Sequence, residues 1–315
     1  MSSPTPTCAP VDSLRPALGG RYEDDGVVVM RRDLRRLRAA ERPISSTPHF
    51  TLGRDGKRLV LVHDLPPEEV HNGLCDLVAQ ELFTPGWAAG SDTFERLVTG
   101  LVLSSHPDPL AAWELFYRNS LQKFATTDPS AEHPGSIATF GRIYRNAEAL
   151  INAVAPTSVL DIGTCFGFLP LRLAGGSAAP VPEVLACDVN PGATQLLDLM
   201  VARLDRPVQT TTCDGAQVPM PDHRVHVVTM VHLLEHVDDE HGSRIIDEAI
   251  RIAARRIVIA VPLEETPDPT YGHIRSFSLA DLRVLGTRWP GWHATVSSSD
   301  GGWLVLDRIA AAFED

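Results

Sequence analysis

Acidic residues and glycines stand where two apolar runs of this sequence end, a pattern suited to holding a nucleotide. The run 158–162 contains Asp161 and leads into Gly163 and Gly167. Glycine accepts a positive φ and leaves no Cβ between backbone and ligand, so we expect a strand that turns sharply into a helix. Asp188 ends the next apolar run, where a nucleotide-binding βαβ unit has the carboxylate that accepts ribose hydroxyls. A turn that binds no ligand is the alternative.

Residues 232–236 read His-Leu-Leu-Glu-His and directly follow the apolar run 227–231. On a helix, H-x-x-E-H is the inverted zinc-peptidase signature, so a zinc peptidase is one hypothesis, which the position after a predicted central strand weakens. The favoured hypothesis is acid–base chemistry. An imidazole has a pKa near neutrality, so His232 or His236 would take a proton from an alcohol acceptor. Histidines with a purely structural role are a third interpretation.

A polar loop, 269–278, follows the apolar run 257–261 and contains three more candidates. His273 is an alternative base, and Tyr271 and Arg275 carry groups that bind a polar acceptor. Loops at the carboxyl edge of a parallel sheet line the ligand crevice, and these residues are candidates for that reason. An ordinary surface loop is the competing interpretation.

Apolar runs alternate with helical patterns over the second half of the chain. The alternation predicts an α/β doubly wound, Rossmann-like fold with a mostly parallel sheet of about seven strands. An amphipathic helix over 136–154 is expected to precede the first strand. The expected strands are 158–162, 184–187, one that ends before Asp214, 227–231 and 257–261, and the expected helices are 167–174, 191–204 and 242–254.

The first part of the chain lacks this alternation, so we expect it to be organised differently. Residues 1–40 are predicted to form a flexible N-terminal arm, because the beginning of this stretch is rich in serine, proline and threonine. A mixed α+β accessory region that covers the substrate is expected over 41–130. The α/β domain is then expected over 131–315, after a boundary loop at 128–135.

The accessory region carries two kinds of local signal. Two apolar runs separated by a short glycine-containing stretch predict a β-hairpin at 49–62. Three helical patterns follow. Proline suits a first helical turn, so Pro66 is expected to open the first helix. Aspartate accepts from free backbone N–H groups, so Asp92 and Asp108 are expected to cap the next two.

Composition excludes several classes of protein. The net charge is −12 and the pI about 5.4, which argues against a broad surface for nucleic acid or anionic membrane. No apolar run approaches the roughly 20 residues of a membrane helix, so no membrane insertion is expected. The five cysteines are odd in number and form no C-x-x-C pair, which predicts a reduced, cytoplasmic setting. The sequence does not predict an oligomeric state.

The order acid-x-Gly-x-x-x-Gly, with an acid at the next strand end, resembles the class I S-adenosylmethionine (SAM) methyltransferases. Asp161, Gly163 and Gly167 match the family's acid-x-Gly-x-Gly-x-Gly loop, and Cys165 stands where the middle glycine usually lies. The resemblance implies SAM as the cofactor. It also implies that Asp161 orders the loop and that Asp188 accepts the ribose hydroxyls, while the Cys165 side chain narrows the approach to the methionine part of the ligand.

Two further stretches carry the same resemblance. Asp214 and Gly215 follow the third expected strand, where the family's acid meets the adenine amino group, and an ordinary turn is the alternative there. The segment 218–222 resembles the family's apolar-Pro-x-Pro-Asp turn. The segment 234–237 matches its apolar-Glu-His-Val run.

Some quinone O-methyltransferases carry E-x-x-E-H at this place and use it to hold a divalent cation beside the substrate. Here a histidine replaces the first glutamate, so the corresponding candidate ligands are His232, Glu235 and His236. An imidazole favours a softer metal than magnesium, or no metal. We therefore expect SAM without a metal, and a divalent ion is the alternative.

The whole chain is also similar to the actinobacterial mycofactocin oligosaccharide methyltransferases, in the loop 163–171 and in the segments 81–87 and 108–113. That resemblance implies methyl transfer to a glucose hydroxyl on a glycan of a peptide-derived redox cofactor, with a histidine as general base. The expected partner is a small-molecule or glycan acceptor, and no nucleic acid. The alternatives are a metal-assisted phenol or quinone O-methyltransferase, a zinc peptidase and a non-catalytic SAM-binding protein.

Overall fold

The computed structural model describes residues 10–32, 44–127, 136–175 and 180–309. They fall into two compact units, the first with the described residues up to Ile137 and the second with those from Ala138 onward. Each unit has its own sheet and its own buried apolar residues. The loop 128–135, where we expected the boundary of the α/β domain, lies outside the described residues.

The first unit is built on a five-stranded sheet. Strands β4 (Phe50–Asp55) and β5 (Arg58–His63) form the antiparallel hairpin predicted at 49–62, and Gly56 at its turn has a φ of +60°. That left-handed conformation suits glycine. The strand order is β1–β2–β5–β4–β3, in which the other strands are β1 (Arg21–Asp24), β2 (Val27–Arg31) and β3 (Ser45–Ser46).

Strands β1 and β2 correct the prediction of a flexible arm over residues 1–40. Val27, Val28 and Val29 are almost completely buried, because β2 lies inside the sheet and pairs in parallel with β5. Tyr22 in β1 is also buried and donates its hydroxyl hydrogen bond to Asp24 at 2.8 Å. The run of valines is a strand signal, so the arm prediction was wrong for residues 21–31.

Helices follow the hairpin, as predicted. Asp108 caps α3, since its carboxylate accepts a hydrogen bond from Leu110 N at 3.1 Å. Asp92 does not cap α2, because that helix begins one residue earlier, after Gly90 at a φ of +85°, and Asp92 instead forms an ion pair with Arg96 at 2.9 Å. The elements are η1 (Pro67–Glu69), α1 (Leu74–Val78), the π-helical turn η2 (Ala79–Phe83), α2 (Ser91–Leu103) and α3 (Pro109–Thr126).

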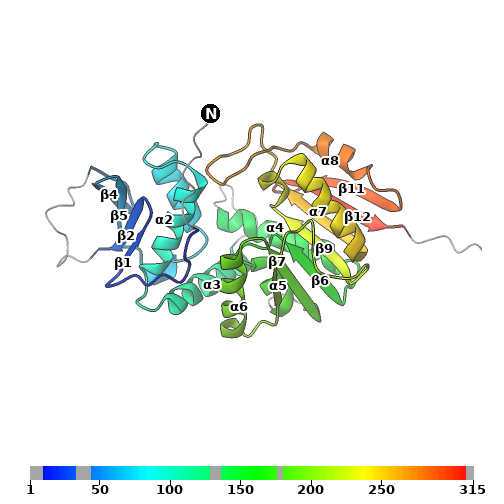
Figure 1. The fold of residues 1–315 in the computed structure, drawn as a ribbon, viewed down its shortest axis with the longest axis horizontal. Coiled ribbons are helices and arrows are strands. Elements are labelled where there is room, and N and C mark those ends of the chain that lie inside the picture. The colour runs from blue at the N-terminus through cyan, green and yellow to red at the C-terminus, as the bar shows by residue number, and fades with distance from the viewer. Residues whose placement is uncertain (1–9, 33–43, 128–135, 176–179, 310–315) are drawn as a thin grey trace, which may run out of the picture. The chain divides into compact units, whose positions relative to one another are not determined.

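The second unit has a seven-stranded, mostly parallel sheet, as predicted (Figure 1). Its strand order is β11–β12–β10–β9–β6–β7–β8. Strands β6 to β10 are parallel to one another, β12 is antiparallel to β10, and β11 is antiparallel to β12. The strands are β6 (Ser158–Ile162), β7 (Glu183–Asp188), β8 (Gln209–Thr212), β9 (Val225–Val231), β10 (Ala253–Val261), β11 (Trp292–Ser298) and β12 (Gly302–Arg308).

Amphipathic helices connect these strands and bury their apolar side against the sheet. In α7, Ile245, Ile246 and Ala249 pack into one core with Val228 of β9 and Ile257 of β10. None of the described helices is long and apolar enough to cross a bilayer. The helical elements are α4 (Ser136–Asn152), which begins in the first unit, α5 (Phe168–Gly175), α6 (Pro191–Leu204), η3 (Leu234–His236), α7 (Asp239–Ile252) and α8 (Leu279–Gly286).

The strand order reverses at β6. From β6 the chain adds β7 and β8 on one side of the sheet, and β9 and β10 on the other. Connections from two such neighbouring strands leave on opposite faces, so a crevice forms at the carboxyl edge between β6 and β9. This order places the glycine loop after β6 beside the segment 232–236 after β9, although the two are far apart in the sequence.

Candidate functional site

A cavity of about 330 Å³ lies at this carboxyl edge of the second unit. Its walls come from the turns after β6, β7, β8 and β9 and from the first turns of α7. The predicted residues that line the cavity are Gly163, Cys165, Asp188, Asp214, Gly215, His232 and His236. Asp161, Gly167 and His273 do not line it.

Backbone conformation and close packing both favour the two glycines of the β6 loop. Gly163 and Gly167 have φ values of +71° and +69°. A Cβ on Gly163 would lie 2.6 Å from Cδ1 of Leu233, and a Cβ on Gly167 would lie 2.5 Å from Cδ2 of Leu197 on α6. A side chain at either position would force Leu233 or Leu197 to shift and would strain the left-handed backbone, so these glycines let the loop pack closely against the turn after β9 and against α6.

Cys165 has a left-handed backbone, with a φ of +49°. That conformation costs roughly 1–2 kcal/mol for a residue with a Cβ, which gives a physical reason for glycine at this position in the related loops. The exposed side chain lines the cavity. Cys165 N donates a hydrogen bond to Oδ2 of Asp188 at 2.9 Å, so the loop is fastened to the end of β7.

Asp161 lies under the glycine loop rather than in the cavity wall. Its carboxylate is buried, and Thr229 on β9 donates a hydrogen bond to Oδ1 at 2.5 Å. This contact ties β6 to β9 at the point where the loops diverge. Burial raises the pKa of Asp161 to about 6, because the charged carboxylate loses its hydration.

The raised pKa of Asp161 predicts how stability depends on pH. The folded state binds the proton of Asp161 more tightly than the unfolded state does. The stabilisation that protonated Asp161 gives to the folded protein is therefore complete below pH 4 and is lost as the pH rises through 6. Asp161→Asn removes the ionisation and keeps an acceptor for Thr229. We expect the free energy of unfolding of the variant, relative to that of wild type, to rise by up to about 3 kcal/mol between pH 4 and 7.

Urea unfolding of both proteins at several pH values measures this difference. The exposed Asp198→Asn on α6 is the control, because it makes the same chemical change outside the buried site. A difference between Asp161→Asn and wild type that does not change with pH would contradict the assignment.

His232 follows β9 directly and has a strained backbone, with a φ of +55°. Its amide donates to the carbonyl of Ala260 at 2.9 Å, and its ring packs against Phe140 of α4 with a centroid distance of 5.4 Å. Nδ1 lies 3.1 Å from Oε1 of Glu235. Strained residues of this kind are held in place by surrounding contacts and concentrate at functional sites.

The segment 232–236 is not an α-helix. His232 follows the last residue of β9, and Leu234–His236 form the short 3₁₀ helix η3. The zinc-peptidase hypothesis needs both histidines one turn apart on a continuous helix face. It was wrong for this segment, because the chain turns sharply at His232.

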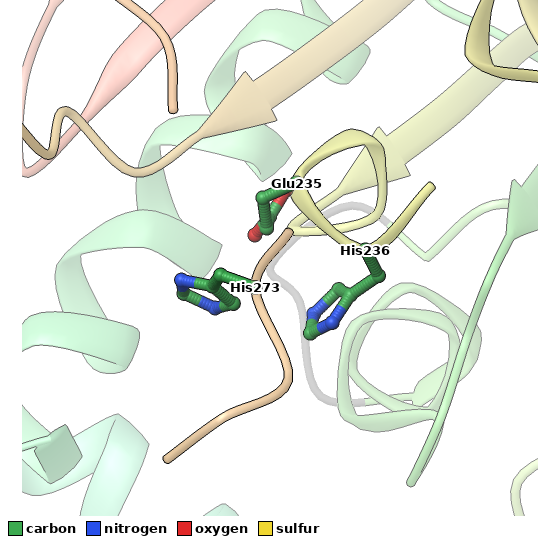
Figure 2. Close-up of side chains that lie close together, drawn as sticks. All are labelled: Glu235, His236 and His273. Carbon is green, nitrogen blue, oxygen red and sulfur yellow. The ribbon is translucent and has the colours of Figure 1, made fainter. Parts of the chain in front are cut away.

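Glu235, His236 and His273 come together from η3 and from the loop after β10 (Figure 2). Candidate ligand atoms of the three side chains all lie within 4.8 Å of one another. The imidazole rings of His236 and His273 meet edge to face at a centroid distance of 4.9 Å. The metal candidates predicted from the sequence were His232, Glu235 and His236, so the structure adds His273 to this neighbourhood.

The segment 159–255, from β6 into β10, matches a family model described as a methyltransferase domain. It contains the glycine loop, Asp188, Asp214 and the segment 232–236, which lie around one crevice. The match indicates a methyltransferase domain over these residues. No curated protein matches the chain.

Several solved structures are similar to part of this chain. Magnesium protoporphyrin IX methyltransferase from Synechocystis PCC 6803 with bound S-adenosylhomocysteine (SAH) is 16% identical with a TM-score of 0.44, over 61% of this chain and 94% of that one. A SAM-dependent methyltransferase from Aquifex aeolicus is 18% identical with a TM-score of 0.43, over 59% and 100%. At these identities nothing follows about the acceptor of this chain.

The cavity of the methyltransferase domain fits SAM chemically. Oδ2 of Asp188 accepts from Cys165 N and Oδ1 from Asn190 N, both at 2.9 Å. Each carboxylate oxygen has another lone pair, so Asp188 can still accept both hydroxyls of a ribose. The volume lies at the lower end of the roughly 300–1,000 Å³ typical of small-molecule sites. Contacts of Asp188 with ribose and of Asp214 with adenine stay predictions.

His241 lines the cavity of the methyltransferase domain, and the sequence did not single it out. It lies in the first turns of α7, and its Nε2 is 3.1 Å from Oδ1 of Asp214. Oδ1 of Asp214 also accepts from Ala216 N at 2.9 Å. The available signal was positional, because the helix that follows the histidine cluster must begin at the same edge of the sheet. Val189 and Cys213, beside the two predicted acids, also line the cavity and were not predicted from the sequence.

Tyr271 and Arg275 do not line the cavity. The guanidinium of Arg275 lies 3.1 Å from Asp239 of α7 and 4.4 Å from the centre of the Phe277 ring. Arg275 therefore fastens the loop after β10 to α7. Tyr271 is 39% exposed and lies beside His273, with a ring distance of 5.9 Å. Contacts of either residue with an acceptor stay predictions.

Proposed function

We propose that this protein transfers the SAM methyl group to a hydroxyl oxygen of an acceptor, with His232 as the general base. The single observation that carries the proposal is that Nδ1 of His232, a residue of the cavity wall, lies 3.1 Å from the buried carboxylate of Glu235. Oxygen acceptors need such a group, because a protonated alcohol is a poor nucleophile.

The proposal gives the two side chains separate tasks. Nδ1 of His232 faces Glu235, so Nε2 is the nitrogen left to take the hydroxyl proton. Glu235 is 0% exposed, and its charge would stabilise the imidazolium that forms. Phe140 packs against the imidazole and restricts its orientation. SAM supplies an electrophilic methyl group on a sulfonium sulfur when bound.

The proposed acceptor is a sugar hydroxyl, with the glycan of mycofactocin as the first to test. Sugar hydroxyls are weakly acidic, so they depend on a base more than phenols do. The resemblance of segments 81–87 and 108–113 to the mycofactocin oligosaccharide methyltransferases supports this choice of acceptor.

The test is an acceptor assay with the full chain. The protein is incubated with SAM and either the mycofactocin oligosaccharide or a catechol, and mass spectrometry follows SAH and the methylated product. We expect a methyl ether on a sugar hydroxyl and little product from the catechol. Methylation of the catechol alone would overturn the sugar proposal. SAH binding without turnover on either acceptor would overturn the base assignment and favour a non-catalytic SAM-binding protein.

A further inference from the structure

The cluster of Glu235, His236 and His273 has the composition of a transition-metal site. Two imidazoles and one carboxylate converge from two segments (Figure 2). A backbone hydrogen bond from Ile274 N to the carbonyl of Glu235, 2.8 Å long, joins these segments. The convergence is therefore fixed by the main chain as well as by the side chains.

Glu235 provides independent evidence for a ligand at this place. It is 0% exposed, and neither carboxylate oxygen has a hydrogen-bond partner among the described residues. Nδ1 of His232 lies near Oε1 without the alignment of a hydrogen bond. A buried carboxylate is costly unless it is paired, hydrogen-bonded or bound to a metal. It has two oxygens, so it can face His232 and a cation at the same time.

His273 is held as metal-binding histidines are. Its Nδ1 lies 2.9 Å from Oε2 and 3.1 Å from Oε1 of Glu264, and its side chain is only 8% exposed. An imidazole that donates one N–H to a carboxylate has a fixed tautomer and presents the other nitrogen to a metal. Glu264 therefore leaves Nε2 of His273 as the ligand atom.

We propose that Glu235, His236 and His273 bind one divalent transition-metal ion of the zinc type, with Glu264 as the residue that positions His273. Imidazole and carboxylate ligands in this ratio suit zinc better than magnesium, which prefers oxygen ligands. Tetrahedral bonds of about 2.0–2.2 Å place ligand atoms about 3.4 Å apart, so side chains whose ligand atoms are now up to 4.8 Å apart would rotate inward by roughly 1 Å on binding. His236 is exposed and lines the cavity, so an entry path for the ion exists.

Such an ion would lie at the edge of the cavity, because His236 is the member of the three that lines it. A hydroxyl bound to a divalent cation loses its proton more readily, because the cation stabilises the alkoxide. The ion would thus assist His232 at the same oxygen. This role rests on the proposed function, whereas metal binding itself does not.

Zinc binding to the metal-stripped full chain tests the proposal without any acceptor. Titration calorimetry with ZnCl₂ is expected to show one ion per chain, and MgCl₂ to bind far more weakly. His236→Ala and His273→Ala are each expected to weaken the zinc site at least about 100-fold, because each removes a direct ligand. His293→Ala, an exposed histidine on β11, is the control and is expected to change nothing.

Two neighbouring glutamates supply a matched pair of variants. Glu264→Gln is expected to weaken zinc binding about 10–100-fold, the usual effect of removing an orienting carboxylate. The exposed Glu265→Gln is expected to leave it unchanged. SAH binding in each variant shows that the second unit is folded, and Glu264→Gln keeps the test valid if an alanine variant unfolds.

Two outcomes would overturn the proposal. One is zinc affinity that is the same in wild type, His236→Ala and His273→Ala. The other is zinc binding that persists in these variants and disappears in Cys165→Ser or Cys213→Ser, since both thiols line the cavity. Zinc binding by the wild-type protein without methyl transfer to any tested acceptor would count against the proposed function and would still support the metal site.

Discussion

His232→Asn is expected to lower kcat about 10²–10⁴-fold, the usual contribution of a general base. Asparagine is chosen because it tolerates the left-handed backbone at position 232, where φ is +55°. Its amide cannot take the hydroxyl proton. The dissociation constant of SAH should change little, since the prediction concerns the proton transfer. Single-turnover kinetics with SAM and calorimetry with SAH separate the two effects.

His223→Asn is the matched control for this experiment. His223 also has a left-handed backbone, with a φ of +54°, but it is exposed and its Nδ1 accepts a hydrogen bond from Arg308 at 3.1 Å. Its replacement is expected to leave kcat unchanged. Unchanged kcat in His232→Asn would remove His232 from the mechanism and return His236 and His273 as candidates for the base.

Asp188→Asn is expected to weaken SAH binding about 100-fold. An asparagine has one acceptor oxygen and no charge, so it cannot accept from Cys165 N, Asn190 N and a ribose diol together. Hydrogen bonds to a charged group contribute about 1.5–3 kcal/mol each, and a loss of about 2.7 kcal/mol corresponds to 100-fold. Calorimetric titration with SAH measures the change.

The exposed Asp198→Asn on α6 serves as the control, because it removes one negative charge from the same unit. Its SAH affinity should stay at the wild-type value. Equal affinity in Asp188→Asn and wild type would mean that Asp188 only fastens the loop through Cys165 and Asn190, and that the ribose is held elsewhere.

The strands and helices of the second unit could be predicted from sequence because their signals are local. The run 158–162 became β6 with the predicted bounds, and the helix expected at 191–204 became α6. Each of these elements has an apolar pattern of its own. The missed strands β1 and β2 show the opposite case, in which serine and proline nearby outweighed a short run of valines.

The partners of the site residues could not be predicted, because strand order determines them. Nothing near Asp161 in the sequence indicates that its carboxylate meets Thr229 on β9. In the same way, Glu264 and His273 follow β10, and only the pairing of β10 with β9 brings His273 beside Glu235. Arg275 was predicted from its polarity, and its ion pair with Asp239 also depends on the folded chain.

The hydrogen bond from Ile274 N to the carbonyl of Glu235 has a consequence for engineering. Through this bond the backbone of the loop after β10 is joined to the backbone of Glu235, the carboxylate beside the proposed base. Substitutions that reshape this loop for a new acceptor will also displace Glu235, so specificity and rate will change together in a directed-evolution experiment. The turns after β7 and β8 offer no independent route, because Asp188 and Asp214 are predicted to hold the cofactor there.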